Sequence, residues 1–331
     1  MYFWWGNRNS PAPPKSAGAA GSCTPGRLPG PVQITFLGTA GSWPTKERNA
    51  SAIAVDLERE VVLLDCGEGA QRQLFQSPTS FMRVRRIFLT HFHGDHFLGL
   101  PGLVQSMGLN NRTEPLDVYG PADATEMVGR ALALGYYTPR FPVTVHALAP
   151  DVTVELDGYR VRTARADHPV PALAYRIEEE AKRGRFDGDR ARALGIRGAD
   201  FARLERGESV RVGTGVVHPS DLLGPPRPGR SIVYSGDSAP SDEIRRLAHR
   251  ATALIHEATV AADLEAEANR WGHSSARQAA NLAAAAEVNG LFLTHFSSRY
   301  KEVDPLEAEA RAVFPASTAA RELISHLLKQ P

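Results

Sequence analysis

The sequence has only two cysteines, Cys23 and Cys66, among its 331 residues. Two cysteines are too few for a disulfide scaffold, and Cys23 lies in a segment that we expect to be disordered. Apolar runs are short, and none approaches the roughly 18 residues that a membrane-spanning helix needs. Residues 1–5 are aromatic but lack the basic start and sustained apolar stretch of a signal peptide. We therefore expect a cytoplasmic protein with no membrane association.

A large excess of charge is also missing. The net charge is +1 and the pI is near 7.9. Such a balance provides no global field to steer nucleic acid, so any polyanion binding must come from local patches. The apolar content of 42 % allows a large core. The first 30 residues are rich in proline, glycine, alanine and serine, which predicts a disordered tail (1–30) before a folded domain (31–331).

Short apolar runs bounded by turn residues predict a series of strands. The first group is expected at 32–36, 52–55, 61–64, 86–90 and 116–119. A second set is expected at 143–147, 152–156, 159–164 and 173–177, followed by core strands at 231–235, 253–255 and, last, 291–294. Helical segments occur at intervals between these runs. This arrangement predicts an α/β protein in which two sheets are sandwiched between helix layers.

The run Ile87–His96 passes from a buried strand into three histidines and an aspartate. His91 and His93 alternate along an extended backbone, so their rings leave on the same side. Asp95 and His96 follow after Gly94 has turned the chain. One turn thus presents two ligand pairs, which suit two divalent ions roughly 3.5–4 Å apart. The alternative is a histidine-rich surface loop, which seldom follows so apolar a strand.

Later strands end in similar side chains. His168 lies in a loop between two strands, Asp237 follows Gly236 at a strand end, and His295 follows the strand at 291–294. Asp237 is placed to bridge two metals, although it could instead cap the helix that contains residues 243–249. Asp65 could orient a ligand histidine or cap the helix that starts near residue 70, and both roles stay open.

The segment from about 178 to 229, here called the arm, is dominated by charge and glycine, and its apolar residues look too scattered to line a core. Between Lys182 and Arg211 there are nine basic residues and five acidic ones. One interpretation is a solvated insertion of mixed charge. The other is a projecting, flexible arm that neutralises phosphates.

The motif His91-Phe-His-Gly-Asp-His96 resembles the HxHxDH signature of the metallo-β-lactamase fold, an αββα four-layer sandwich. Further stretches are together similar to ribonuclease Z, the tRNA 3′-processing endonuclease: Phe36–Gly41, Leu64–Gln73, Tyr234–Ser238, His256–Thr259, Gly272–Ser274 and Thr294–Tyr300. The resemblance implies a zinc-dependent endoribonuclease that removes the 3′ trailer of precursor tRNA and leaves a 3′-hydroxyl. It also implies a homodimer and an arm that grips the tRNA, although Ile196–Asp200 lacks the Gly-Pro pair usual in that arm.

The same resemblance implies roles for individual residues. His91, His93 and His168 would hold one zinc ion, Asp95, His96 and His295 the other, and Asp237 would bridge them. Mn²⁺ or Co²⁺ would also suit this ligand set. Asp95 would take a proton from the attacking water, and His273, oriented by Glu257, would protonate the leaving oxygen. Without the family, Glu257 and His273 could equally be a helix-terminal ion pair and a helix cap.

Two other functions compete with this one. A related zinc hydrolase could act on a small ester, a sulfate ester or a cyclic phosphodiester, but it would have little use for a basic arm. A catalytically silent RNA-binding module is the other possibility, and the intact set of metal ligands argues against it.

Overall fold

The computed structural model describes residues 32–181 and 184–330. The predicted tail, Cys23 and two of the basic arm residues, Lys182 and Arg183, lie outside the described residues. The chain divides into two compact units, a body (residues 32–187 and 223–330) and a smaller arm unit (residues 188–222). No helix in the described ranges combines the length and the apolar character that crossing a bilayer requires.

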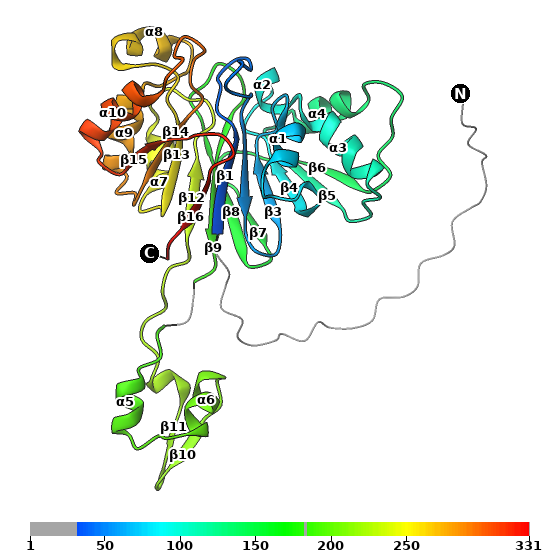
Figure 1. The fold of residues 1–331 in the computed structure, drawn as a ribbon. Coiled ribbons are helices and arrows are strands. Elements are labelled where there is room, and N and C mark those ends of the chain that lie inside the picture. The colour runs from blue at the N-terminus through cyan, green and yellow to red at the C-terminus, as the bar shows by residue number, and fades with distance from the viewer. Residues whose placement is uncertain (1–31, 182–183, 331) are drawn as a thin grey trace, which may run out of the picture. The chain divides into compact units, whose positions relative to one another are not determined.

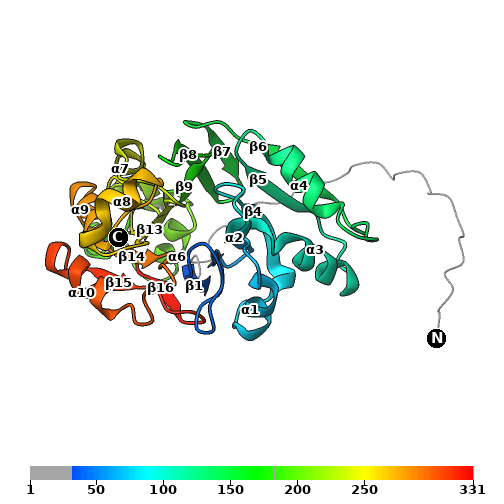
Figure 2. The same cartoon turned by 90° about the horizontal axis from the view of Figure 1, so that it is seen from above.

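Two seven-stranded sheets form the centre of the body (Figures 1 and 2). The first sheet contains, in spatial order, β16 (Ser325–Leu328), β1 (Val32–Gly38), β2 (Ala52–Asp56), β3 (Val61–Leu64), β4 (Val84–Phe88), β5 (Leu116–Gly120) and β6 (Val143–Ala147). The second sheet contains β15 (Ser317–Ala319), β14 (Leu291–Thr294), β13 (Ala253–Glu257), β12 (Ser231–Tyr234), β9 (Leu173–Glu179), β8 (Tyr159–Arg165) and β7 (Thr153–Leu156).

Side chains from both sheets meet in a shared apolar core. Ile34 and Phe88 of the first sheet belong to the same buried cluster as Tyr175 and Ile255 of the second. The rings of Phe88 and Tyr175 lie 5.3 Å apart in an edge-on arrangement. Strands buried on both faces read as near-continuous apolar runs, and β3 and β12 are buried along their whole length.

Helices cover the outer face of each sheet and complete the four layers. Those on the first sheet are α1 (Ala70–Gln76), α3 (Leu100–Leu109) and α4 (Ala124–Leu132). Those near the second sheet are α7 (Asp242–Ala248), α8 (Glu265–Arg270), α9 (Ala276–Ala285) and α10 (Asp304–Val313). A one-turn helix, α2 (Gly94–Phe97), lies at the histidine turn. The fold is therefore the predicted αββα sandwich.

Two details of the sequence prediction are wrong, and the structure resolves one that the sequence left open. The sequence left open which sheet contains residues 143–147, and β6 pairs in parallel with β5 of the first sheet. The strand at 291–294 is not the last, because β15 pairs with it and β16 pairs with β1. His256 and Glu257 do not follow the strand at 253–255 but belong to it, since β13 continues through Glu257.

The C-terminal part of the chain holds the N-terminal loops in place. Glu322 accepts hydrogen bonds from the backbone nitrogens of Thr39 (3.1 Å) and Asn49 (2.6 Å) and from Nε2 of Gln73 (2.8 Å). Burial raises the pKa of the Glu322 carboxyl, although these donors oppose the shift. Glu322 thus holds the segment that follows β1 by hydrogen bonds, and β16 pairs with β1 itself.

The arm unit has a small core of its own, contrary to the prediction that its apolar residues are too scattered. It contains α5 (Gly188–Ala193), α6 (Ala199–Glu205) and a hairpin of β10 (Val210–Val212) and β11 (Gly215–Val217). The buried side chains are those of Ala191, Ile196, Leu204, Val210 and Leu222. They are too widely spaced to show a helical or strand period.

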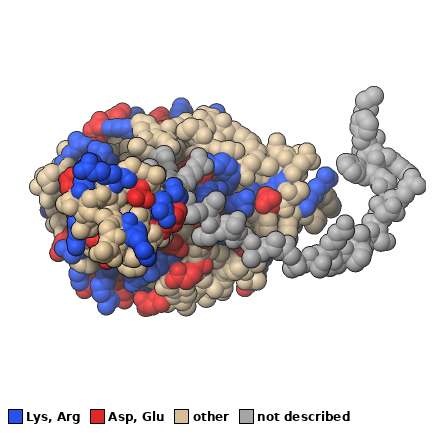
Figure 3. All heavy atoms as spheres, turned by 90° about the horizontal axis from the view of Figure 1, so that it is seen from below, with Lys and Arg blue, Asp and Glu red and all other residues tan. Residues whose placement is uncertain are grey.

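The arm unit has a smaller excess of basic residues than the stretch from Lys182 to Arg211, on which the prediction of a basic arm depended. The unit has six arginines and five acidic residues. Arg192 pairs with Asp189 at 2.5 Å, and Arg203 and Arg206 both pair with Glu208. On the face shown in Figure 3, basic and acidic side chains are interspersed.

Candidate metal centre and active site

The histidine turn begins where β4 ends. Thr90 and His91 are fully buried, and the chain then turns into α2, for which His93 is the N-cap residue. Asp95 and His96 lie in the single turn of α2. The turn therefore presents His91 and His93 before the helix and Asp95 and His96 within it, as the sequence predicted.

His168 joins His91 and His93. It lies on the loop between β8 and β9, and its Nδ1 is 3.0 Å from the carbonyl oxygen of Gly272. Its Nε2 then faces His93, whose Nδ1 is 3.2 Å away and is also 3.0 Å from Nε2 of His91. Ligand atoms of the three histidines all lie within 4.8 Å of one another, close enough to hold one metal ion.

A second cluster contains Asp95, His96 and His295. Oδ2 of Asp95 lies 3.4 Å from Nε2 of His96 and 3.4 Å from Nε2 of His295. Asp237 lies between the two clusters. Its Oδ2 is 3.2 Å from Nε2 of His295, 3.4 Å from Nε2 of His96 and 3.9 Å from Nε2 of His91. All seven predicted ligands therefore lie close together. Asp237 does not cap α7, because the N-cap residue of that helix is Ser241.

Buried atoms without hydrogen bonds show that these residues fit a cation. Nε2 of His96 and Oδ1 of Asp237 are both buried and make no hydrogen bond. Such atoms are costly unless a ligand satisfies them. Burial, with the neighbouring His96, lowers the pKa of His91 well below its usual value, which keeps the lone pair of its ring available. Histidine nitrogen and carboxylate oxygen are the donor types that divalent transition metals prefer.

Asp65 supports the second cluster from behind. It is fully buried, and its Oδ2 lies 2.7 Å from Nδ1 of His96 and accepts a hydrogen bond from the Tyr234 hydroxyl (2.8 Å). Its Oδ1 accepts a hydrogen bond from the backbone nitrogen of Thr90 (2.7 Å). The bond to Nδ1 leaves Nε2 of His96 to face the cluster. Asp65 therefore orients a ligand histidine and does not cap α1, whose N-cap residue is Gly69.

Glu257 and His273 form a pair beside the clusters. Oε1 of Glu257 lies 3.0 Å from Nδ1 of His273, which is also 3.8 Å from Oδ2 of Asp237. Burial opposes the charged form of His273, but Glu257 outweighs that effect and raises the pKa of His273 to about 9. The imidazole is thus protonated at neutral pH. Neither helix role applies, because Glu257 ends β13 and the N-cap residue of α9 is Ser275.

Two contributors to the site were not predicted from the sequence. The hydroxyl of Thr259 lies 2.6 Å from Oε2 of Glu257 and 3.0 Å from Nδ1 of His295. It therefore connects Glu257, the partner of His273, with a candidate metal ligand. The backbone nitrogen of Ser42 donates to Oδ2 of Asp95 at 2.7 Å. Thr259 belongs to the His256–Thr259 motif, which could have revealed it. The backbone nitrogen of Ser42 could not be predicted as a donor, because almost every residue type has such a nitrogen.

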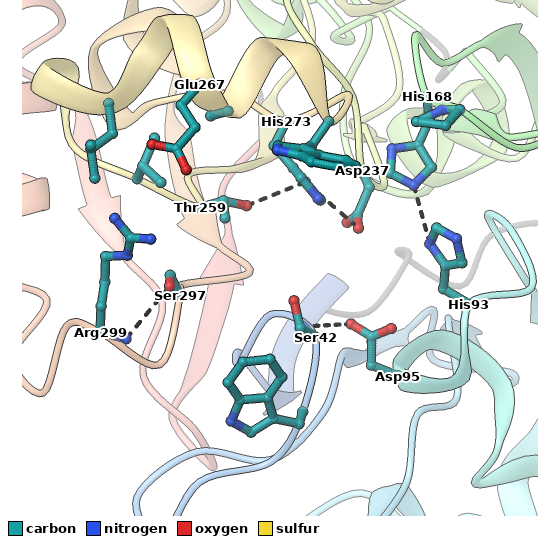
Figure 4. A pocket seen from close by; sticks show the side chains of 16 residues that line it. Ser42, His93, Asp95, His168, Asp237, Thr259, Glu267, His273, Ser297 and Arg299 are labelled. Carbon is teal, nitrogen blue, oxygen red and sulfur yellow. Dashed lines mark hydrogen bonds and ion pairs between the residues drawn. The ribbon is translucent and has the colours of Figure 1, made fainter.

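The clusters open into a pocket of about 640 Å³. Figure 4 shows Ser42 and Asp95 on one side of it and Thr259 and His273 on the other. Burial raises the pKa of the Asp95 carboxyl, but the neighbouring rings of His295 and His96 outweigh that effect and hold this pKa well below its usual range. Asp95 is therefore ionised at neutral pH. The pocket can present a cation, a carboxylate and a protonated imidazole to one substrate.

This fold and this site define a metal-dependent hydrolase of the metallo-β-lactamase fold. Residues 222–296 match the family model described as "Beta-lactamase superfamily domain", and residues 32–173 match one described as "Anti-Pycsar protein Apyc1". Among solved structures, the YhfI protein from Bacillus subtilis, titled a metallo-beta-lactamase fold protein, has a TM-score of 0.65 over 90 % of this chain and 99 % of that one, at 21 % identity.

More similar proteins narrow the class. Ribonuclease Z of Methanothermobacter thermautotrophicus is 46 % identical over 295 residues, which cover 89 % of this chain and 96 % of the relative. Ribonuclease Z of Myxococcus xanthus is 42 % identical, covering 83 % and 89 %. The short form of human tRNase Z has a TM-score of 0.66 and 27 % identity, covering 90 % and 99 %. The chain belongs to the ribonuclease Z family.

Proposed function

We propose that this protein is a zinc-dependent endoribonuclease that removes the 3′ trailer from precursor tRNA and leaves a 3′-hydroxyl on the tRNA. Its membership of the ribonuclease Z family carries this proposal. The site is consistent with it, because hydrolysis of a phosphodiester needs a nucleophile, charge stabilisation and an acid for the leaving oxygen. The described residues include candidates for each of these tasks.

The seven ligands support a site for two Zn²⁺ ions per subunit, with Mn²⁺ or Co²⁺ as substitutes. His91, His93 and His168 would hold one ion, Asp95, His96 and His295 the other, and Asp237 would contact both. When bound, a pair of zinc ions lowers the pKa of water and stabilises negative charge on the phosphoryl oxygens.

Asp95 and His273 then move the two protons of the reaction. Asp95 is ionised and accepts a proton as the water oxygen bonds to phosphorus. The bond between phosphorus and the 3′-oxygen of the tRNA breaks, and His273 gives its proton to that oxygen. Glu257 stabilises the protonated form of His273 before the transfer. The products are a tRNA 3′-hydroxyl and a trailer with a 5′-phosphate.

The arm is proposed to bind the tRNA away from the cut, so that binding energy places the acceptor stem at the site. Arg197 and Arg211 support this role, because both are exposed arginines of the arm unit. We further propose a cytoplasmic homodimer. Large exposed side chains at the ends of α3 and α4, Leu109 and Leu134, are consistent with contact between two copies.

Mapping the product end tests the function. The purified protein is incubated with a tRNA that carries a 3′ trailer, and the new 3′ end is sequenced. The proposal expects one cut after the acceptor stem, a ligatable 3′-hydroxyl and a 5′-phosphate on the trailer. Cleavage of a cyclic phosphodiester or a small ester, with the tRNA left intact, would support the competing small-molecule hydrolase instead.

Replacing His273 with alanine is expected to slow tRNA cleavage by about a hundredfold, because the 3′-oxygen is a poor leaving group that needs a proton. Hydrolysis of bis(4-nitrophenyl) phosphate should change little, since nitrophenolate leaves without protonation. Single-turnover rates on both substrates provide the measurement. His249→Ala, which removes an exposed histidine of the body, serves as control. Equal losses on both substrates would count against the acid role of His273.

A further inference from the structure

A tryptophan with no part in the proposed chemistry lies beside the site. Trp271 lines the pocket together with His168 and His273, yet 67 % of the residue is exposed. It ends α8 as the C-cap residue, and it belongs to none of the three apolar cores of the described residues. A large aromatic ring that is exposed next to a catalytic site, and not needed for packing, indicates a surface for a ligand.

The backbone around Trp271 fixes the position of this residue relative to the site. Gly272, which follows it, has a φ of +73°, and a Cβ there would lie only 2.6 Å from Cδ of Pro169. Its carbonyl oxygen lies 3.0 Å from Nδ1 of His168. The short segment from Trp271 to His273 is therefore packed tightly against the loop that carries a metal ligand. The backbone therefore places Trp271 at the edge of the pocket.

The proposed reaction decides which part of the RNA reaches this edge. His273 protonates the leaving 3′-oxygen, so the nucleotide that carries this oxygen must lie on the His273 side of the pocket. Trp271 is two residues from His273 and lines the same pocket. Figure 4 shows His273 and His168 on the side opposite Ser42 and Asp95. The base nearest Trp271 is thus the last one that the tRNA keeps.

The other lining residues fit an RNA strand with an unpaired base. Leu264, Ala268 and Val260 make the wall near Trp271 apolar. Arg299 is the one lysine or arginine among the described residues that line the pocket, and it is exposed. An exposed indole for a base and a guanidinium for a phosphate are the usual elements of single-strand recognition.

We infer that Trp271 is a stacking platform for the base of the nucleotide immediately 5′ of the cut. This inference rests on the proposed function, which supplies the polarity of the strand. Stacking accepts any of the four bases, because each presents an aromatic face. Trp271 therefore positions the scissile phosphate through the neighbouring base and does not select a sequence.

A double-mutant cycle tests the inference. Wild type and Trp271→Ala are compared on a precursor tRNA and on the same RNA with an abasic nucleotide just 5′ of the cut. Each change alone is expected to lower kcat/KM about tenfold, the effect of losing one stack. Trp271→Ala acting on the abasic RNA should lower kcat/KM by no more than either change alone, since both changes remove the same contact. Trp271→Phe should retain most of the activity.

Trp43→Ala is the matched control, because Trp43 is also an exposed tryptophan (60 %) that lines the pocket, but it follows Ser42 on the Asp95 side. In this variant, removing the base should lower kcat/KM by the same factor as it does in the wild type. Additive effects of Trp271→Ala and the abasic nucleotide, or coupling of that nucleotide to Trp43 instead, would overturn the inference. Wild-type cleavage of the intact RNA tests the proposed function separately, so the two failures are distinguishable.

Discussion

Replacing Asp95 with alanine is expected to lower the rate of tRNA cleavage by about a thousandfold or more, since the residue is both a metal ligand and a proton acceptor in the proposed reaction. Its Oδ2 lies 3.4 Å from Nε2 of both His96 and His295, and it accepts the hydrogen bond from Ser42. Single-turnover rates with saturating enzyme, together with zinc content by mass spectrometry, provide the measurement.

Asp95→Asn separates the two roles of this carboxylate. The amide retains an oxygen for a metal and for the Ser42 nitrogen, but it cannot accept the proton. A slow variant with normal zinc content would support the base role, whereas loss of zinc would assign the effect to ligation. Asp157→Ala removes an aspartate from an exposed ion pair with Arg59 and should leave the rate unchanged. Near-normal cleavage by Asp95→Ala would remove Asp95 from the mechanism.

Removing the arm unit is expected to reduce cleavage of precursor tRNA by about a hundredfold or more at physiological salt, because phosphate contacts dominate the affinity of such interfaces. Hydrolysis of bis(4-nitrophenyl) phosphate should persist. The structure suggests where to cut. Phe186 and Leu223 of the body form an antiparallel bridge, and the backbone nitrogen of Gly224 donates to the carbonyl oxygen of Arg185 (2.9 Å). A turn of two to four residues can therefore replace the arm unit, residues 188–222.

Two point variants refine the arm experiment. Arg197→Ala and Arg211→Ala together should weaken tRNA binding and reduce its salt dependence, as expected when phosphate contacts are lost. The matched control is Arg192→Ala, because Arg192 already pairs with Asp189. The measurement is KM at several salt concentrations. A deletion that impairs both substrates equally, in a protein with unchanged thermal stability, would argue against a role of the arm in tRNA binding.

Much of the site could be predicted because its ligands follow buried strands. β4 leads to His91, β12 to Asp237 and β14 to His295, and an apolar run that stops at such a residue is visible in sequence. The strands β3, β6 and β14 also have the predicted bounds. Which strands are neighbours is a different question, because pairing depends on contacts that are remote in sequence. For this reason the sequence did not show that β6 pairs with β5.

The arm unit and the C-terminal strands show the limits of periodicity. The arm core depends on a few side chains, such as Ile196 and Leu204, in a chain dominated by charge and glycine. β16 has the burial of an edge strand, with only Leu328 buried, so it lacks the apolar signal of the central strands. Ser42 contributes through its backbone, which no pattern of side chains can reveal. Such elements become visible only when the chain is folded.

The spread of the ligands along the chain has a consequence for biosynthesis. His91 leaves the ribosome early, but His295 follows about two hundred residues later, and Glu322 and β16 fasten the loop after β1 later still. A chain that ends before residue 295 lacks His295, so its second ligand cluster is incomplete. The second cluster can therefore be completed only after most of the chain has been synthesised.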